Sequence, residues 1–208
     1  MAASSHSDNL SFLPQPVDAT NPPTAAASVG SAVGGDAGGF SNDNKVFRLY
    51  CLAFHHFDDD MAREVLASTL KTAHGFAILE LQDRRPLTLL LMLGEGVLVW
   101  LTTLFWFWHD PIQLFFTYIM PILPCVMLFD GLVSCLRTRT WEEFVELVEL
   151  TMQGQDDEPN HVDVTPEVVS WTDDRMSCRL GGWGFTACRD LHTWPFGYTN
   201  FIVGKRMT

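Results

Sequence analysis

The chain has 208 residues, of which 25 are Asp or Glu and 13 are Lys or Arg, so its formal net charge is −12. Such an acidic chain lacks the basic face that binds phosphates, and we therefore expect no nucleic-acid partner. Hydrophobic residues make up 47% of the chain and charged residues only 18%, which indicates a concentrated apolar segment. The five cysteines include no Cys-x-x-Cys pair, a pattern typical of reduced intracellular thiols.

Residues 1–44 are rich in Ala, Ser, Gly and Pro, and we expect most of this segment to be disordered. The exception is a short strand near residues 10–18, which ends in a turn at Asp18. The Gly-rich tract 30–39 has the composition of a phosphate-binding loop. We do not assign it that role, because no apolar strand precedes it and no periodic helix follows it.

The pattern of residues 45–83 predicts a strand, a helix and a second strand. Residues 46–54 are almost wholly apolar, as expected of a central strand buried on both faces. Asp58 is the expected N-cap of the helix, and Gly75 its expected stop. Residues 75–81 predict a second buried strand, so the unit is a crossover between parallel strands.

Residues 84–136 hold the hydrophobic excess. The stretch 87–108 contains one charge, Glu95, and the stretch 112–129 contains none. Arginines lie only outside this pair, so the positive-inside rule places both outer ends on the cytosolic side of a membrane. We therefore predict a transmembrane or membrane-inserted hairpin in contact with membrane lipid, with the α/β domain on the cytosolic side. A helix pair buried in a soluble lid is the alternative.

Three residues within this segment have predicted local effects. Pro121 and Pro124 are expected to kink the second arm. Glu95 is either a functional intramembrane group, such as a substrate contact or proton relay, or part of a backbone break at the membrane interface between Gly94 and Gly96.

Residues 137–208 return to the pattern of a soluble domain. Thr140 and Glu143 have the spacing of a capping box at the start of an amphipathic helix. Residues 182–188 and 198–203 then predict an antiparallel hairpin that completes a mixed sheet.

Taken in order, several segments resemble the second half of a class I S-adenosylmethionine-dependent methyltransferase. The segments are PVDAT, AFHHFDDDMAREVL, GFAILELQDRR, DGLVSCLRTRT and LHTWPFGY. More narrowly, the last four of these segments look like a group of methyltransferase-like proteins of filamentous fungi with a hydrophobic insertion. The resemblance implies an α/β fold with an incomplete Rossmann-like sheet, a C-terminal antiparallel hairpin and an inserted hydrophobic helical hairpin.

The resemblance also implies site residues. Asp18, with Ala19 beside it, would reach the adenine of S-adenosylmethionine. Phe54, His55 and His56 would line the floor near the sulfonium, and the hydrophobic hairpin would cover a hydrophobic small-molecule acceptor.

From their chemistry alone, His55 and His56 are candidate general bases, with structural histidines as the alternative. We expect no metal at these histidines. Adjacent residues at a strand end point to opposite faces, and residues 58–60 suit a helix cap and first turn.

The chain lacks the strand and GxGxG loop that would hold the methionine part of the donor in that family. The enzyme assignment therefore stays open. We expect a truncated or catalytically degenerate methyltransferase-like protein, with a non-enzymatic membrane-anchored scaffold as the alternative. A two-span membrane protein with unrelated flanks is a third possibility, and it predicts that the flanks do not form one sheet.

Overall fold

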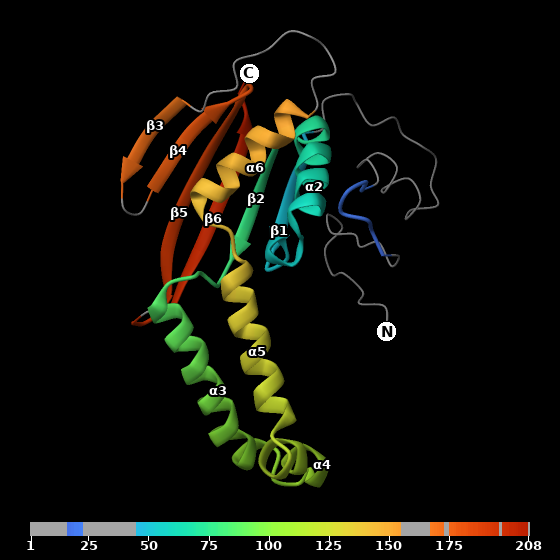
Figure 1. Cartoon of the computed structure of the whole chain (residues 1–208), viewed down its shortest axis with the longest axis vertical. Coiled ribbons are helices and arrows are strands. Elements are labelled where there is room, and N and C mark those ends of the chain that lie inside the picture. Colours follow the sequence, from blue (N-terminus) through green and yellow to red (C-terminus); the bar gives the residue numbers. More distant parts are fainter. Residues whose placement is uncertain (1–15, 23–44, 155–166, 173–174, 196, 208) are drawn as a thin grey trace.

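A computed structural model describes residues 16–22, 45–154, 167–172, 175–195 and 197–207, which form a mixed α/β domain and a projecting helical hairpin (Figure 1). The domain contains a six-stranded sheet with the order β1-β2-β6-β5-β4-β3. Its strands are β1 (Phe47–Cys51), β2 (Gly75–Glu80), β3 (Glu167–Thr172), β4 (Arg175–Leu180), β5 (Trp183–Thr193) and β6 (Gly197–Arg206). Strands from both sides of the hydrophobic segment share this sheet, so the possibility of two unrelated flanks is wrong.

The pairing directions follow the expected chain path. β1 and β2 are parallel, and the helix α2 (Asp59–Thr72) connects them. β6 pairs antiparallel with β2 on one side and with β5 on the other. The predicted crossover unit and the predicted C-terminal hairpin are therefore both confirmed.

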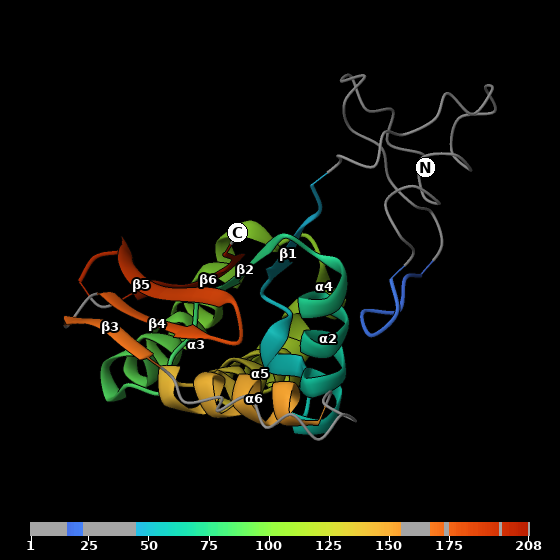
Figure 2. The ribbon, with the colours of Figure 1, turned by 90° about the horizontal axis from the view of Figure 1, so that it is seen from above.

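The core lies between one face of the sheet and two helices, α2 and α6 (Trp141–Gln153), which Figure 2 shows side by side. Phe76 of β2, Phe144 of α6 and Phe185 of β5 form the centre of this core, and each is at most 2% exposed. Their rings lie within 6.5 Å of one another, centroid to centroid. Burial of three aromatic side chains is a large apolar contribution to folding.

The local signals that start the two helices are confirmed. Asp58 caps α2 by accepting a hydrogen bond from the Met61 backbone N–H. Thr140 and Glu143 form the full reciprocal capping box of α6. Gly75, however, is the first residue of β2, because α2 already ends at Thr72.

The prediction that residues 46–54 form a central strand is wrong. The strand covers only Phe47–Cys51, and it lies at the edge of the sheet among the described residues. Arg48 and Tyr50 face α2, where both donate or share hydrogen bonds with Thr69. Phe47 and Leu49 point to the opposite face and are about 60% exposed. No described helix crosses that face (Figure 2), so the apolar run reflects an uncovered edge rather than a doubly covered strand.

Two other parts of the sheet differ from the sequence-based prediction. β3 and β4 were not predicted, although they extend the sheet by an antiparallel pair. Residues 16–18, the described part of the predicted strand near 10–18, do not form a strand. The rest of that predicted strand lies outside the described residues.

The hydrophobic segment folds as a hairpin whose arms are α3 (Pro86–Trp106) and α5 (Ile122–Arg137). Between them lie the short helix α4 (Pro111–Leu114) and the π-helix η2 (Phe115–Ile119). The second arm bends by 66° between η2 and α5. The break lies at Met120 and Pro121, as proline's missing N–H leads one to expect, whereas Pro124 is accommodated in the first turn of α5.

Candidate functional site

The hairpin is packed with small and polar residues inside and large apolar residues outside. Thr103 of α3, Thr117 of η2 and Ser134 of α5 are each at most 6% exposed. By contrast, Phe105 and Phe129 are 77% and 70% exposed. This is the reverse of the arrangement in a water-soluble helical bundle, in which the apolar side chains face inward.

Several hydroxyl groups of the hairpin donate hydrogen bonds to carbonyl groups within it. Thr103 Oγ1 donates to the Val99 carbonyl at 2.7 Å, and Thr117 Oγ1 donates to the Gln113 carbonyl at 2.7 Å. The Tyr118 hydroxyl crosses to α3 and donates to the Trp100 carbonyl at 2.6 Å. Internal satisfaction of polar groups is the main structural requirement for chain inside lipid.

Glycines allow the two arms to approach closely. A Cβ on Gly96 of α3 would lie 3.4 Å from Leu128 Cδ1, and a Cβ on Gly131 of α5 would lie 3.3 Å from Met92 Sδ. Small residues at helix contacts are typical of membrane helix pairs. α3 is long and apolar enough to cross a membrane, and only 11% of its apolar window is buried. The helix pair is therefore not buried within the described part of this chain, and its insertion into a membrane stays a prediction.

Glu95 lies within the uninterrupted helix α3 and is exposed. The backbone break between Gly94 and Gly96, one of the two interpretations of this residue, is therefore wrong. A carboxylate near the middle of an apolar helix is unusual, so it is a feature that any function of the hairpin must accommodate.

Arg137, the last residue of α5, and Arg139 join the hairpin to the turn after β1. Arg137 donates to the His56 carbonyl at 3.0 Å. Arg139 donates to the carbonyls of Phe54 and Phe57 and to Asp59 Oδ1. Arg139 is only 10% exposed. This contact makes the foot of the hairpin and the turn one continuous hydrogen-bonded structure.

A buried carboxylate holds the same turn from the opposite side. Glu80, the last residue of β2, accepts hydrogen bonds at Oε1 from the backbone N–H groups of Phe54 and His55, at 2.9 and 3.2 Å. Its Oε2 lies 2.7 Å from Nδ1 of His55, and both side chains are at most 7% exposed. Because a carboxylate oxygen only accepts, the Nδ1 atom carries the hydrogen and the ring is fixed in orientation.

This geometry gives the predicted site residues distinct positions. Phe54 and His55 are buried beside Glu80, whereas His56 is exposed and its ring lies against that of His55, with a centroid distance of 4.2 Å and an interplanar angle of 42°. Asp18 is exposed and accepts two hydrogen bonds from Thr20, the next residue but one after it, which lowers the pKa of the Asp18 carboxyl. Ala19 packs against the hydrophobic core.

The structure therefore brings together Phe54, His55 and His56 but does not join them to Asp18. Residues 16–22 form a bend that Figures 1 and 2 place beside α2, outside the sheet. Among the described residues, Asp18 Oδ1 accepts from Thr20, and no hydrogen bond joins Asp18 to the histidines.

Glu80, Arg137 and Arg139 were not predicted as members of this site. Glu80 was read as part of a buried strand, and the arginines as markers of the cytosolic side. A glutamate at the end of a strand that is otherwise apolar was the one available signal, because a buried carboxylate needs a partner.

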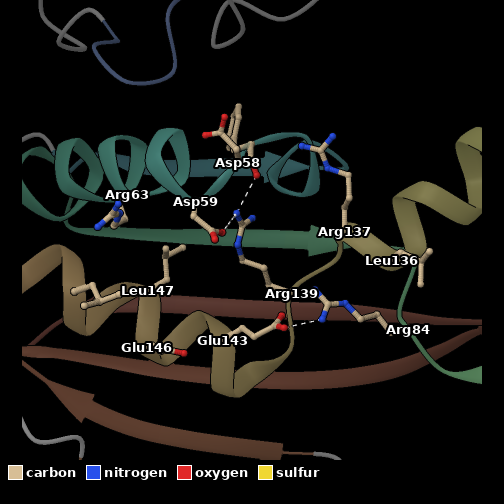
Figure 3. A pocket seen from close by; sticks show the side chains of 12 residues that line it. Asp58, Asp59, Arg63, Arg84, Leu136, Arg137, Arg139, Glu143, Glu146 and Leu147 are labelled. Atoms are coloured by element: carbon tan, nitrogen blue, oxygen red, sulfur yellow. Dashed lines mark hydrogen bonds and ion pairs between the residues drawn. The ribbon is translucent and has the colours of Figure 1, made fainter.

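The same region contains a cleft of about 560 Å³ between α2 and α6, which we call the α2–α6 cleft (Figure 3). Its charged lining comprises Asp58, Asp59, Arg63, Arg84, Arg137, Arg139, Glu143 and Glu146. Arg84 pairs with Glu143 at 2.6 Å. Burial alone would raise the pKa of Glu143, but the Thr140 N–H and Arg84 outweigh it and lower that pKa.

Neither the Cys178 thiol nor any cluster of metal-ligating residues in the described ranges indicates a further reactive site. Burial, followed by the nearby Glu149 charge, raises the pKa of the Cys178 thiol to about 11, so this thiol is protonated near neutral pH. Within the described ranges, no group of three or more His, Cys, Asp or Glu side chains is placed to hold a metal ion.

Comparison of the chain with protein-family models, with curated proteins and with solved structures finds no match in any of the three. Its function is therefore inferred from its own residues, of which the hairpin and its foot form the most distinctive group.

Proposed function

We propose that the α3–α5 hairpin inserts into a lipid bilayer and holds the α/β domain at the cytosolic surface of the membrane. The observation that carries this proposal is the inverted packing of the hairpin, with Thr and Ser hydroxyls inside and Phe, Leu and Ile side chains outside. Such a surface is unstable in water, because a large exposed apolar patch associates or aggregates. In lipid it is the surface expected of a membrane protein.

The dimensions of the hairpin fit the proposal. α3 has 21 residues, which at about 1.5 Å per residue gives a length of about 31 Å. The hydrocarbon core of a bilayer is about 30 Å thick. Trp106 and Trp108 at the tip are 76% and 63% exposed, and tryptophan is enriched at membrane interfaces.

The charges at the other end supply the orientation. Arg84 and Arg85 precede α3, while Arg137 ends α5 and Arg139 follows it. Arginine on both sides of a short hairpin favours retention of both ends in the cytosol. The α/β domain, which contains both flanks of the hairpin, then lies on that side.

The test is alkaline carbonate extraction of membranes from cells that express the full chain. We expect the chain to stay in the membrane pellet. The double variant Leu98→Arg/Leu101→Arg changes two side chains of α3 that are already 58% and 51% exposed. Two arginines near the centre of a membrane helix cost about 5–7 kcal/mol of insertion free energy, so this variant should move to the soluble fraction.

The matched control is Leu49→Arg/Leu191→Arg, which changes two leucines of the α/β domain with similar exposure, 59% and 49%. It should remain in the pellet. Release of the unchanged chain, or equal behaviour of the two double variants, would overturn the proposal.

For the domain itself we propose a non-enzymatic scaffold role as the leading function, with methyl transfer from S-adenosylmethionine to a hydrophobic acceptor as the second candidate. The contact between the buried side chains of His55 and Glu80 supports the scaffold role, because both groups are engaged in holding the turn after β1. The parallel β1–β2 pair and the antiparallel β6 beside it support the second candidate, since they agree with an incomplete Rossmann-like methyltransferase sheet.

Calorimetric titration of the purified chain in detergent with S-adenosylmethionine separates these candidates. The scaffold role predicts no binding heat and no thermal shift. Saturable binding at micromolar strength, about −8 kcal/mol, would reverse the order of the two candidates.

A further inference from the structure

We propose that the α2–α6 cleft binds the phosphate group of an anionic phospholipid, with Arg84 and Arg137 as its ligands and the acyl chains along α5. This inference rests on the proposed membrane insertion of the hairpin and adds a ligand to it. The cleft opens where α5 enters the domain, and Figure 3 shows Leu136 and Arg137 at that end of it.

Arg84 and Arg137, the two exposed arginines at the hairpin end of the cleft, retain donors for a ligand, whereas Arg63 lies farther along the cleft on α2 and pairs with Asp60 (Figure 3). A guanidinium has five N–H donors. Arg137 uses one on the His56 carbonyl, and Arg84 uses one on Glu143 Oε1. Both side chains are exposed. Arg139, by contrast, is largely buried and bonded to three acceptors, so its role is to hold the turn.

The carboxylates that line the cleft are mostly engaged by groups of the domain itself. Asp58 caps α2, and Asp59 pairs with Arg139. Glu143 accepts from the Thr140 N–H and from Arg84. Glu146 lies farther along α6, away from Arg137 (Figure 3). The end of the cleft nearest the hairpin therefore presents guanidinium donors, which are well suited to bind a phosphate through paired hydrogen bonds.

An apolar path leads from this end of the cleft along the hairpin. Leu136, adjacent to Arg137, is 57% exposed, and Phe129, about two turns earlier on α5, is 70% exposed. Inorganic phosphate has no apolar atoms that could contact this surface, whereas the acyl chains of a lipid would lie on it. This continuity of charge and apolar surface favours a lipid phosphate over inorganic phosphate.

The test is titration of the full chain, in micelles of an uncharged detergent, with dioctanoyl phosphatidic acid and separately with inorganic phosphate. Tryptophan fluorescence and calorimetry report the binding. We expect saturable binding of the lipid and at least tenfold weaker binding of inorganic phosphate. Equal affinity for the two would overturn the lipid assignment, and no saturable binding of either would overturn the site.

Substitutions then locate the site. Arg84→Gln and Arg137→Gln should each weaken lipid binding about tenfold or more, because each removes charged hydrogen bonds. Arg137→Lys keeps the charge but loses the paired geometry, and it should also weaken binding. The matched control is Arg85→Gln, which removes the same charge from the same linker but does not line the cleft. An equal loss with Arg85→Gln would show diffuse attraction of charges and overturn the cleft as the site.

Carbonate extraction keeps this inference separate from the membrane proposal. A chain that stays in the membrane pellet but binds no phosphatidic acid would overturn the cleft alone. A chain that binds phosphatidic acid in micelles but is released by carbonate would overturn bilayer insertion alone.

Discussion

Substitution of Glu80 should destabilise the domain more than substitution of any exposed acidic residue, because Glu80 holds the turn to which the hairpin is attached. Its two oxygens accept hydrogen bonds from the Phe54 N–H, the His55 N–H and the His55 ring. All three donors are buried, and none of them can turn to water when the acceptor is removed.

The structure sets the expected magnitudes. Glu80→Ala leaves one buried ring N–H and two buried backbone N–H groups without an acceptor, and each unpaired buried donor costs about 1–3 kcal/mol, so the loss should be at least about 3 kcal/mol. Glu80→Gln keeps a carbonyl oxygen for the two backbone N–H groups. His55 can then present its other tautomer to the amide, so the loss should be about 1–2 kcal/mol. Glu146→Ala, on the exposed face of α6, should change stability by less than about 0.5 kcal/mol.

The assay is thermal unfolding of the three variants in detergent micelles, followed by circular dichroism. About 1 kcal/mol corresponds to about 2–4 °C in the unfolding temperature of a domain of this size. The expected order of stability is Glu146→Ala, then Glu80→Gln, then Glu80→Ala. Equal unfolding temperatures for Glu80→Ala and Glu146→Ala would refute the reasoning, since they would mean that the buried donors find other acceptors.

Three further predictions concern single positions. Glu95→Leu removes the one carboxylate of α3 and should strengthen membrane insertion by about 2.5–3.5 kcal/mol, measured as greater retention on carbonate extraction at raised pH; unchanged retention would mean that Glu95 already has a partner in the membrane. Glu143 has a lowered pKa in the folded chain through the Thr140 N–H and Arg84, which outweigh its burial, so its stabilising effect is complete above its unfolded pKa of about 4.5 and is lost as pH falls through the folded value. The difference in unfolding temperature between the unchanged chain and Glu143→Gln should therefore shrink between pH 7 and pH 3, and a constant difference would contradict this. Gly204→Ala places a Cβ in steric overlap with Cε1 and Cζ of the buried Phe76 ring on β2, so chemical unfolding should show a loss of about 1–3 kcal/mol, and a neutral result would mean that the ring moves freely.

Features set by neighbours in the sequence were predictable. The capping box of Thr140 and Glu143 depends on residues three positions apart, and α6 begins where this pattern places it. The hydrophobic hairpin could likewise be predicted from composition alone, because few soluble domains contain two neighbouring long stretches that are almost free of charge.

Features set by distant parts of the chain were not predictable in the same way. An apolar run such as residues 46–54 indicates a strand but not which strands flank it, so the edge position of β1 was missed. The bond between His55 and Glu80 joins residues that are 25 positions apart. The chemistry of imidazole is enough to make the histidines candidates from the sequence. The contact of Glu80 with His55 depends on the pairing of β2 with β1, which the sequence does not specify.

The most direct test of membrane insertion uses two native cysteines, Cys51 and Cys125. Neither side chain is covered by other described parts of the chain. Cys51 lies on β1, and Cys125 lies in α5 at about 18 Å along the helix from Arg137. The full chain is reconstituted into lipid vesicles, treated with a membrane-impermeant maleimide and analysed by mass spectrometry of its peptides. Bilayer insertion predicts labelling of Cys51 and protection of Cys125, and labelling of both cysteines to the same extent would contradict it.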